Sequence, residues 1–217
     1  MRATISGHGY RLQAADEGAP LGSMQLIAGA AHDALQDAGV TKDQVGALFT
    51  PRASGSDRVF QFNMKVLNEL KIVPTLTSEI TTHGAGSVSM LFHAALAVSA
   101  GYVDYALCVA GDTGRRRSTN TRSNAALEAD PYFELPVGPS TPSLYAQVAS
   151  RYMHETGATR EQFAHAAISQ REWALHNPWA VMAPKGPLTI EEVVASRPIA
   201  TPLHLLVCAP FFRGGSG

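Results

Sequence analysis

The sequence predicts an α/β fold built around a mostly parallel β-sheet. Up to residue 112, short β-type runs alternate with segments whose apolar residues recur at helical spacing, which is the pattern of βαβ units. Two of the runs, 45–51 and 104–112, are apolar almost throughout, which is typical of strands covered on both faces. With 217 residues, 45% of them apolar, the chain can bury the core of one sizeable domain, or of a domain with a subdomain.

The first βαβ pattern lies within residues 2–51. Residues 2–7 (RATISG) carry β-type side chains and predict a strand. Between Met24 and Ala38, apolar residues recur every three or four positions, and Gly39 is well placed to end this helix. Residues 45–51 (VGALFTP) then form an apolar run that predicts a buried strand.

The second βαβ pattern contains a glycine-bearing turn. A strand at 74–80 (PTLTSEI) alternates enough to predict partial exposure, and the turn at 81–86 (TTHGAG) leads from it into a helix. The remaining elements predicted here are a short helix before the strand, marked by Phe60, Met64 and Leu67, a helix over 87–99 with Ser87 as N-cap and Gly101 past its end, and a fully apolar strand at 104–112.

The chain changes character after residue 112. Arginine, serine, asparagine and proline replace the aliphatic residues over 113–142, which predicts a surface excursion of the kind that is often functional or mobile. Three helices are expected next, two of them with capping boxes formed by Thr159 with Gln162 and by Thr189 with Glu192. The expected elements are helices at 143–157, 159–177 and 188–197, then an aliphatic strand and a glycine-rich turn within 199–217.

Charge and cysteine content exclude several classes of function. The net charge of −1, with both signs interspersed, gives no footprint for nucleic acid or for an anionic membrane. Cys108 and Cys208 lie in apolar runs, so we expect free thiols in a reducing, cytoplasmic setting. No leader sequence and no apolar span of about 20 residues is recognised, so a soluble intracellular protein is expected, and no metal site is predicted.

Several motifs follow one another in a recognisable order. They are the helix at 145–157, Arg-Glu-Gln at 160–162, Asn-Pro at 177–178, Leu-Thr-Ile-Glu-Glu-Val at 188–193 and Ser-Arg-Pro-Ile at 196–199, preceded by HDALQDAGV at 32–40 and the run at 91–112. In these motifs the chain resembles the thiolase superfamily, in particular its sterol-carrier-protein-type thiolases and acetyl-CoA acetyltransferase-like members. The resemblance covers nearly the whole chain.

The resemblance implies a layered fold made of two copies of a core unit, with a loop domain inserted in the first copy. On that map, residues 1–112 are most of the first core unit, 113–202 are the inserted helical loop domain, and 203–217 return to the core. The second copy is absent from this chain. In the family that copy supplies the catalytic His and a second catalytic Cys, so a complete site is not expected within this chain alone.

The resemblance also implies a function in lipid metabolism, with an acyl-coenzyme A thioester as substrate and no permanently bound cofactor. The family's nucleophilic Cys sits on the turn between the third strand and its helix, and that position belongs here to Gly84, after His83. A thiolate is required to accept an acyl group, so the usual acyltransferase reaction is not expected. Some family members without the Cys carry out retro-aldol cleavage with an OB-fold partner subunit, and a homodimer or hetero-oligomer is expected here.

Backbone geometry is what the turn retains without its nucleophile. Gly84, Ala85 and Gly86 can bring amide groups close to a thioester carbonyl, and the helix N-terminus behind them favours negative charge. Such donors are worth about 3–4 kcal/mol of transition-state stabilisation. His83, at the mouth of the turn, is a candidate general base. Arg115, Arg116 and Arg117, with Arg122 nearby, are candidates for the phosphates of coenzyme A.

Less specific interpretations stay open for the same residues. The turn can be a plain strand-to-helix connection whose glycines serve a positive φ or close packing, and the arginine run can be a solvated face. Gly84, Gly86 and Ser89 also fit a loose dinucleotide-binding pattern with Asp104 downstream, although the turn follows the third strand rather than the first. In a further alternative, the protein is a non-catalytic partner subunit whose 74–80 strand pairs with its twin across a dimer.

Overall fold

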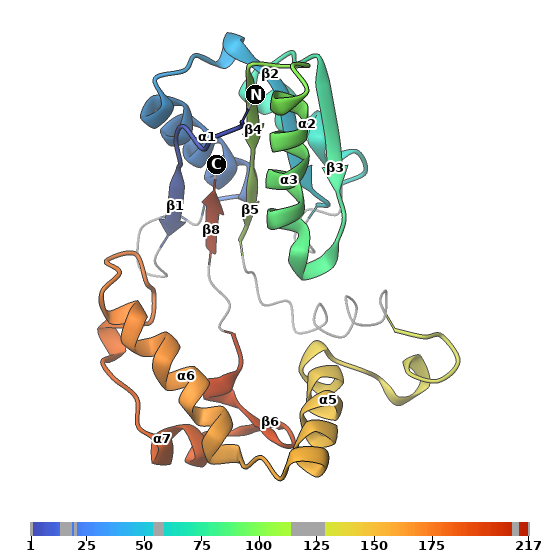
Figure 1. Cartoon of the computed structure of the whole chain (residues 1–217), viewed down its shortest axis with the longest axis vertical. Coiled ribbons are helices and arrows are strands. Elements are labelled where there is room, and N and C mark those ends of the chain that lie inside the picture. The colour runs from blue at the N-terminus through green and yellow to red at the C-terminus, as the bar shows by residue number, and fades with distance from the viewer. Residues whose placement is uncertain are drawn as a thin grey trace. The chain divides into compact units, whose positions relative to one another are not determined.

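The computed structural model describes residues 2–13, 19, 21–53, 59–113, 129–209 and 213–216. The chain forms two compact units, shown in Figure 1. Unit 1 comprises Met1–Arg115 together with Phe212–Gly217, and unit 2 comprises Arg116–Phe211. Unit 2 is therefore inserted between the fifth strand of unit 1 and its last strand.

Unit 1 has a parallel sheet at its centre, which confirms the predicted fold class. β2 (Val45–Pro51) lies between β3 (Leu76–Ile80) and β4 (Tyr105–Cys108), and both neighbours run parallel to it. The Val109 amide, just after β4, donates to the Phe49 carbonyl at 3.0 Å, and the chain then continues as β5 (Ala110–Asp112). β5 belongs to a second, antiparallel sheet, in which β8 (Arg213–Ser216) lies between β1 (Tyr10–Gln13) and β5.

Helices cover both faces of the parallel strands because side chains of β2 alternate between two cores. On one face, Leu48 packs with α1 (Ser23–Ala38) and α2 (Phe62–Leu70). On the other face, Ala47 and Phe49 pack against α3 (Gly86–Ser99), through residues that include Met90, Ala94 and Ala97. Gly39 ends α1 with φ of 65°, as its position after the helix predicted.

Two segments of unit 1 differ from the prediction. Residues 2–7 are not a strand, because this segment runs against α1: a Cβ on Gly7 would lie 2.5 Å from the Ala34 carbonyl oxygen. The first strand comes later, at β1, where β8 provides a ladder partner. The glycine-rich C-terminal segment, predicted as a turn, is β8 itself, since backbone groups alone make ladder hydrogen bonds and glycine supplies them as other residues do.

Unit 2 is mainly helical. α5 (Thr141–Thr156) packs on the hairpin of β6 (Pro198–Ala200) and β7 (Leu203–His204), and α6 (Arg160–Leu175) packs on α7 (Ile190–Ala195). The predicted capping boxes are present, with Thr159 accepting from the Gln162 amide and Thr189 from the Glu192 amide. No helix in the described part of the chain is long and apolar enough to cross a bilayer.

Candidate active site

The predicted elbow lies at the carboxyl edge of the parallel strands, where ligands of open α/β sheets bind. β3 ends at Ile80, two exposed threonines follow, and a 3-10 helix (η2, His83–Ala85) leads directly into α3. Gly84 and Ala85 are exposed, whereas Gly86 is buried beneath the first turn of α3. The position that carries the nucleophile in the thiolase family is therefore open to solvent in unit 1.

The backbone conformation of the elbow does not require glycine at position 84 or 86. Neither Gly84 nor Gly86 has a positive φ; in the described part of the chain the glycines that do are Gly39, Gly101, Gly138, Gly157 and Gly186. A Cβ built on Gly84 would meet no atom within 4 Å, and one on Gly86 would lie in ordinary contact, 3.9 Å from the Ile80 carbonyl oxygen. The interpretation of these glycines as a need for positive φ or for close packing is therefore wrong. The elbow has room for a side chain at position 84 and lacks one.

The donors that the elbow offers are fewer than its glycine content predicts. The Ala85 amide donates to the Thr82 carbonyl at 3.0 Å, so it is occupied within the 3-10 helix. The Gly84 amide donates to no other described residue. The N-cap of α3 is Ala85 rather than the predicted Ser87, because the chain enters the helix through η2, and no side chain caps this end. Uncapped first-turn amides and the helix dipole favour negative charge here.

The cysteines of the chain do not replace the missing nucleophile. Cys108 lies on β4, packed against the core that α3 covers, and burial raises the pKa of its thiol to about 11. It is therefore protonated near neutral pH, as expected of an inert core residue. Cys208 belongs to unit 2, and partial burial raises the pKa of its thiol as well.

Several predicted site residues fall outside the description. The side chain of His83 lies outside the described part of the structure, although its backbone begins η2. Arg115, Arg116 and Arg117 lie outside the described residues, as does Arg122. Their roles stay predictions. Among the described residues, no group of three His, Cys, Asp or Glu side chains is placed to hold a metal ion.

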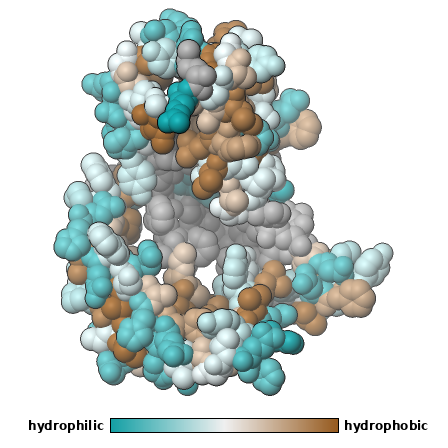
Figure 2. All heavy atoms as spheres, in the orientation of Figure 1, coloured by the Kyte–Doolittle hydropathy of each residue, from teal (hydrophilic) through white to brown (hydrophobic). Residues whose placement is uncertain are grey.

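Sequence reasoning missed two features near the elbow. The Thr50 hydroxyl, near the end of β2, is fully buried and has no hydrogen-bond partner among the described residues, a costly arrangement that a strand pattern does not reveal. In addition, α3 is not amphipathic, since large apolar side chains emerge on its outer face, over which Figure 2 shows hydrophobic atoms. They are Val88, Leu91, Phe92 and Leu96, exposed by 71%, 48%, 61% and 51%. The all-round apolar sequence of 86–99 was the available signal.

No protein-family model matches the sequence. Among solved structures, the chain shares the fold of a monomeric SCP2-thiolase-like protein from Mycobacterium smegmatis, with a TM-score of 0.69 over 98% of this chain and 43% of that chain, at 17% identity. It superposes on an Ltp2–ChsH2(DUF35) aldolase with a TM-score of 0.78 over 99% of this chain and 54% of that chain, at 30% identity. The architecture is therefore the thiolase fold.

Sequence similarity agrees with the structural match. The chain is 33% identical over 193 residues to the 17-hydroxy-3-oxo-4-pregnene-20-carboxyl-CoA lyase of Mycobacterium tuberculosis, covering 85% of this chain and 49% of that protein. It is 30% identical over 193 residues to an acetyl-CoA acetyltransferase of Methanothermobacter thermautotrophicus, covering 88% and 50%. The chain belongs to the thiolase superfamily, and it spans about half the length of the curated relatives it matches.

Proposed function

We propose that the chain binds acyl-coenzyme A thioesters at the Gly84 elbow and takes part in retro-aldol cleavage of a β-hydroxyacyl-CoA. The observation that carries the proposal is the open position at Gly84, where a side chain fits but none is present. Because the fold does not force glycine there, its presence points to a chemistry that needs no nucleophile. The relatives named as a lyase and an aldolase support this reaction class.

The proposed reaction uses the elbow only as an electrostatic support. A base removes the proton of the β-hydroxyl, the bond between the α- and β-carbons breaks, and the β-carbon becomes a carbonyl. The electron pair of that bond moves into the thioester as an enolate, whose oxygen the Gly84 amide and the N-terminus of α3 stabilise. An acid then protonates the α-carbon, which releases a shortened acyl-CoA. His83 is a candidate for one of these proton transfers.

Acyl transfer, the reaction of the acetyltransferase relative, is less well supported. It requires an acyl-enzyme, and position 84 offers no atom to form one. Cys108 does not substitute, since the raised pKa of its thiol keeps it protonated. We therefore propose that the elbow polarises a thioester carbonyl without attacking it, and that Arg115, Arg116 and Arg117 bind coenzyme A phosphates.

We further propose that the protein acts within an oligomer. The aldolase structure that this chain resembles contains a second kind of subunit, ChsH2(DUF35). The bare apolar face of α3 begins at Val88, in the first turn of the helix that follows the elbow, so a subunit that covers this face would lie beside the elbow. The alternative of a non-catalytic partner subunit predicts assembly without thioester binding.

Acyl-CoA titration and cysteine replacement together test the proposal. In calorimetry, the protein is expected to bind a β-hydroxyacyl-CoA more tightly than free coenzyme A, and absence of any acyl-CoA binding would sink the proposal. Incubation with acetyl-CoA is expected to leave the mass of the wild-type protein unchanged, whereas Gly84→Cys gains an acetyl group. Ser87→Cys, an exposed neighbour on α3, is the control and is expected to stay unlabelled. A covalent gain on the wild-type elbow contradicts the assignment.

A further inference from the structure

One arginine of unit 2 is buried without a carboxylate to neutralise it. Arg171 lies on the face of α6 that carries the buried Ala164 about two turns earlier, and it is only 7% exposed. Its Nη1 atom donates to the Gly186 carbonyl at 2.8 Å. Among the described residues, no ion pair involves Arg171. Arginine is seldom buried in this way, because a charge taken out of water is costly unless it is paired.

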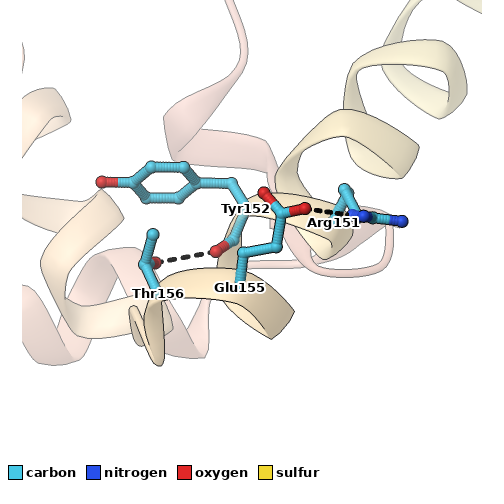
Figure 3. A network of polar contacts seen from close by, with 4 residues as sticks. All are labelled: Arg151, Tyr152, Glu155 and Thr156. Carbon is cyan, nitrogen blue, oxygen red and sulfur yellow. Dashed lines mark hydrogen bonds and ion pairs between the residues drawn. The ribbon is translucent and has the colours of Figure 1, made fainter.

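The exposed arginine of α5 shows the opposite arrangement. Arg151 lies largely in solvent, yet its Nε atom donates to the Glu155 carboxylate at 2.6 Å, as Figure 3 shows. An ion pair at such an exposed position contributes little to stability. A carboxylate partner is therefore present where water already solvates the charge, and it is absent where the charge is buried. Pairing within the described part of unit 2 does not explain the burial of Arg171.

The backbone at Gly186 is shaped to receive the guanidinium group. Gly186 follows the 3-10 helix η4 (Ala183–Lys185) and has φ of 75° and ψ of −172°, a conformation that is open essentially to glycine alone. Its carbonyl receives the Nη1 hydrogen bond, while its own amide donates to the Ala183 carbonyl at 3.0 Å. One corner of the guanidinium group is therefore held by a backbone group, which cannot swing away as a side chain can.

The other edge of the guanidinium group is free. With Nη1 engaged, Nε and Nη2 remain, and their N–H bonds point the same way in a rigid fork. Neither atom has a hydrogen-bond partner among the described residues. Neither belongs to the atoms of these residues that are both unpaired and sealed from solvent. The edge of Arg171 therefore reaches the surface through a small opening, and a fork of this kind fits the two oxygens of a carboxylate.

We propose that the free edge of Arg171 binds the carboxylate of a small organic acid. A planar carboxylate at the end of a slender chain suits an opening that leaves the residue 7% exposed, whereas a tetrahedral phosphate is wider. Binding neutralises a buried charge, which is a gain that a fully solvated arginine does not offer. Lys185, exposed and next to Gly186 in the chain, adds a second positive charge. The site lies within unit 2 and does not depend on thioester binding at the Gly84 elbow.

Titration with acetate, followed by nuclear magnetic resonance of the arginine side chains, tests the site directly. The Nε–H signal of Arg171, identified by its absence from Arg171→Lys, is expected to move with added sodium acetate and to reach a plateau. The Nε–H signal of Arg151, which Glu155 engages, is expected to stay in place. Sodium chloride at the same ionic strength is the control for screening and is expected to give no plateau. A response to acetate no larger than that to chloride overturns the proposal, as does tighter binding of phosphate than of acetate.

Thermal unfolding supplies the second measurement. Acetate is expected to raise the unfolding midpoint of the wild type, because a ligand that binds only the folded state stabilises it. Arg171→Met removes the charge and keeps an apolar stem, so it is expected to have an unchanged or higher midpoint in chloride and to lose the response to acetate. Arg171→Lys keeps the charge without the fork and is expected to weaken acetate binding roughly tenfold or more.

Arg151→Met is the matched control, because it removes an arginine that is exposed and already paired. Its midpoint is expected to respond to acetate as that of the wild type does. An Arg171→Met protein that still responds to acetate overturns the proposal. If Arg171→Met does not fold, Arg171→Lys decides alone, and acetate binding as tight as in the wild type overturns the role of the fork.

Discussion

Gly9 and Gly84 show that glycine serves opposite purposes at two positions of unit 1. A Cβ on Gly9 would lie 1.9 Å from the Ala30 carbonyl oxygen, so the backbone of α1 leaves no room for any side chain. At Gly84 a Cβ would meet open space, so packing is not the reason for its glycine. Packing thus accounts for the first glycine, and we attribute the second to chemistry.

The two positions predict different responses to the same added methyl group. Gly9→Ala is expected to lower the free energy of unfolding by about 1–3 kcal/mol, because α1 must shift to relieve the overlap. Gly84→Ala is expected to change it by less than about 0.5 kcal/mol, the usual range for surface substitutions. Denaturant titration of both variants measures the difference. Equal losses would show that the elbow is packed more tightly than its open position indicates.

The pH dependence of Cys108 provides a second test at the residue scale. Because burial raises the pKa of its thiol to about 11, from an ordinary value near 9, the folded protein retains a proton that the unfolded chain loses first. This contribution to stability is fully present below pH 9 and is lost as the pH rises towards 11. Alkylation of Cys108 at pH 8 is expected to be roughly 100-fold slower than that of a free cysteine, as measured by mass spectrometry of the modified peptide. Rapid labelling in the folded protein would refute the assignment.

What the sequence could predict of the site is limited by the path of the backbone. Position 84 was located from the resemblance to the thiolase family, because a strand, a turn and a helix follow there in fixed order. The hydrogen bond from the Ala85 amide to the Thr82 carbonyl could not be predicted, since it depends on a 3-10 turn for which the sequence has no characteristic residue type. The unpaired hydroxyl of Thr50 depends likewise on which atoms surround it in the folded chain.

At the scale of elements, helix starts were predictable where a side chain makes the cap. Thr159 and Thr189 each stand three residues before a Gln or Glu, and both form the expected capping boxes. Ser87 has the right residue type for a cap but lies inside α3, because the helix follows η2 directly and its N-cap is Ala85, two residues earlier. The strands β1 and β8 were harder to predict than the helix starts. A strand forms only where a neighbouring strand pairs with it, and β8 lies about 200 residues from β1 along the chain.

The cap of α6 gives a prediction at this scale. Thr159→Ala removes the hydroxyl that accepts from the Gln162 amide, while the Gln162 side chain keeps its bond to the amide of residue 159 at 2.9 Å. The expected loss is about 1 kcal/mol of unfolding free energy. Thr159→Ser keeps an acceptor in place and is expected to stay within a few tenths of a kcal/mol of the wild type. Thermal unfolding followed by circular dichroism distinguishes the two, and an Ala variant as stable as the Ser variant would contradict the role of this cap.

At the scale of the whole molecule, the outer face of α3 is the feature that most needs a cover. A helix that is apolar all round is normally buried, yet α3 is packed on one side only within unit 1. The chain spans about half the length of its curated relatives, and we propose that further protein, in the same or another chain, covers this face.

Fluorescent probes of apolar surface test whether the α3 face is bare. The protein is expected to bind anilinonaphthalene sulfonate, and Phe92→Ser is expected to reduce the fluorescence because it removes the largest exposed side chain of the face. Phe133→Ser, on unit 2, is the comparison for loss of an exposed Phe elsewhere. Equal fluorescence from wild type and Phe92→Ser would indicate that α3 is already covered.

The place of β8 between β1 and β5 sets an order of events during synthesis. About 100 residues separate the end of β5 from the start of β8. A ribosome adds roughly 5–20 residues each second, so the two flanking strands emerge several seconds before the strand that joins them. During that interval the nascent chain carries open strand edges, which are prone to mispairing with other chains. Newly made protein thus depends on prompt synthesis of β8, or on a chaperone, more than the folded molecule does.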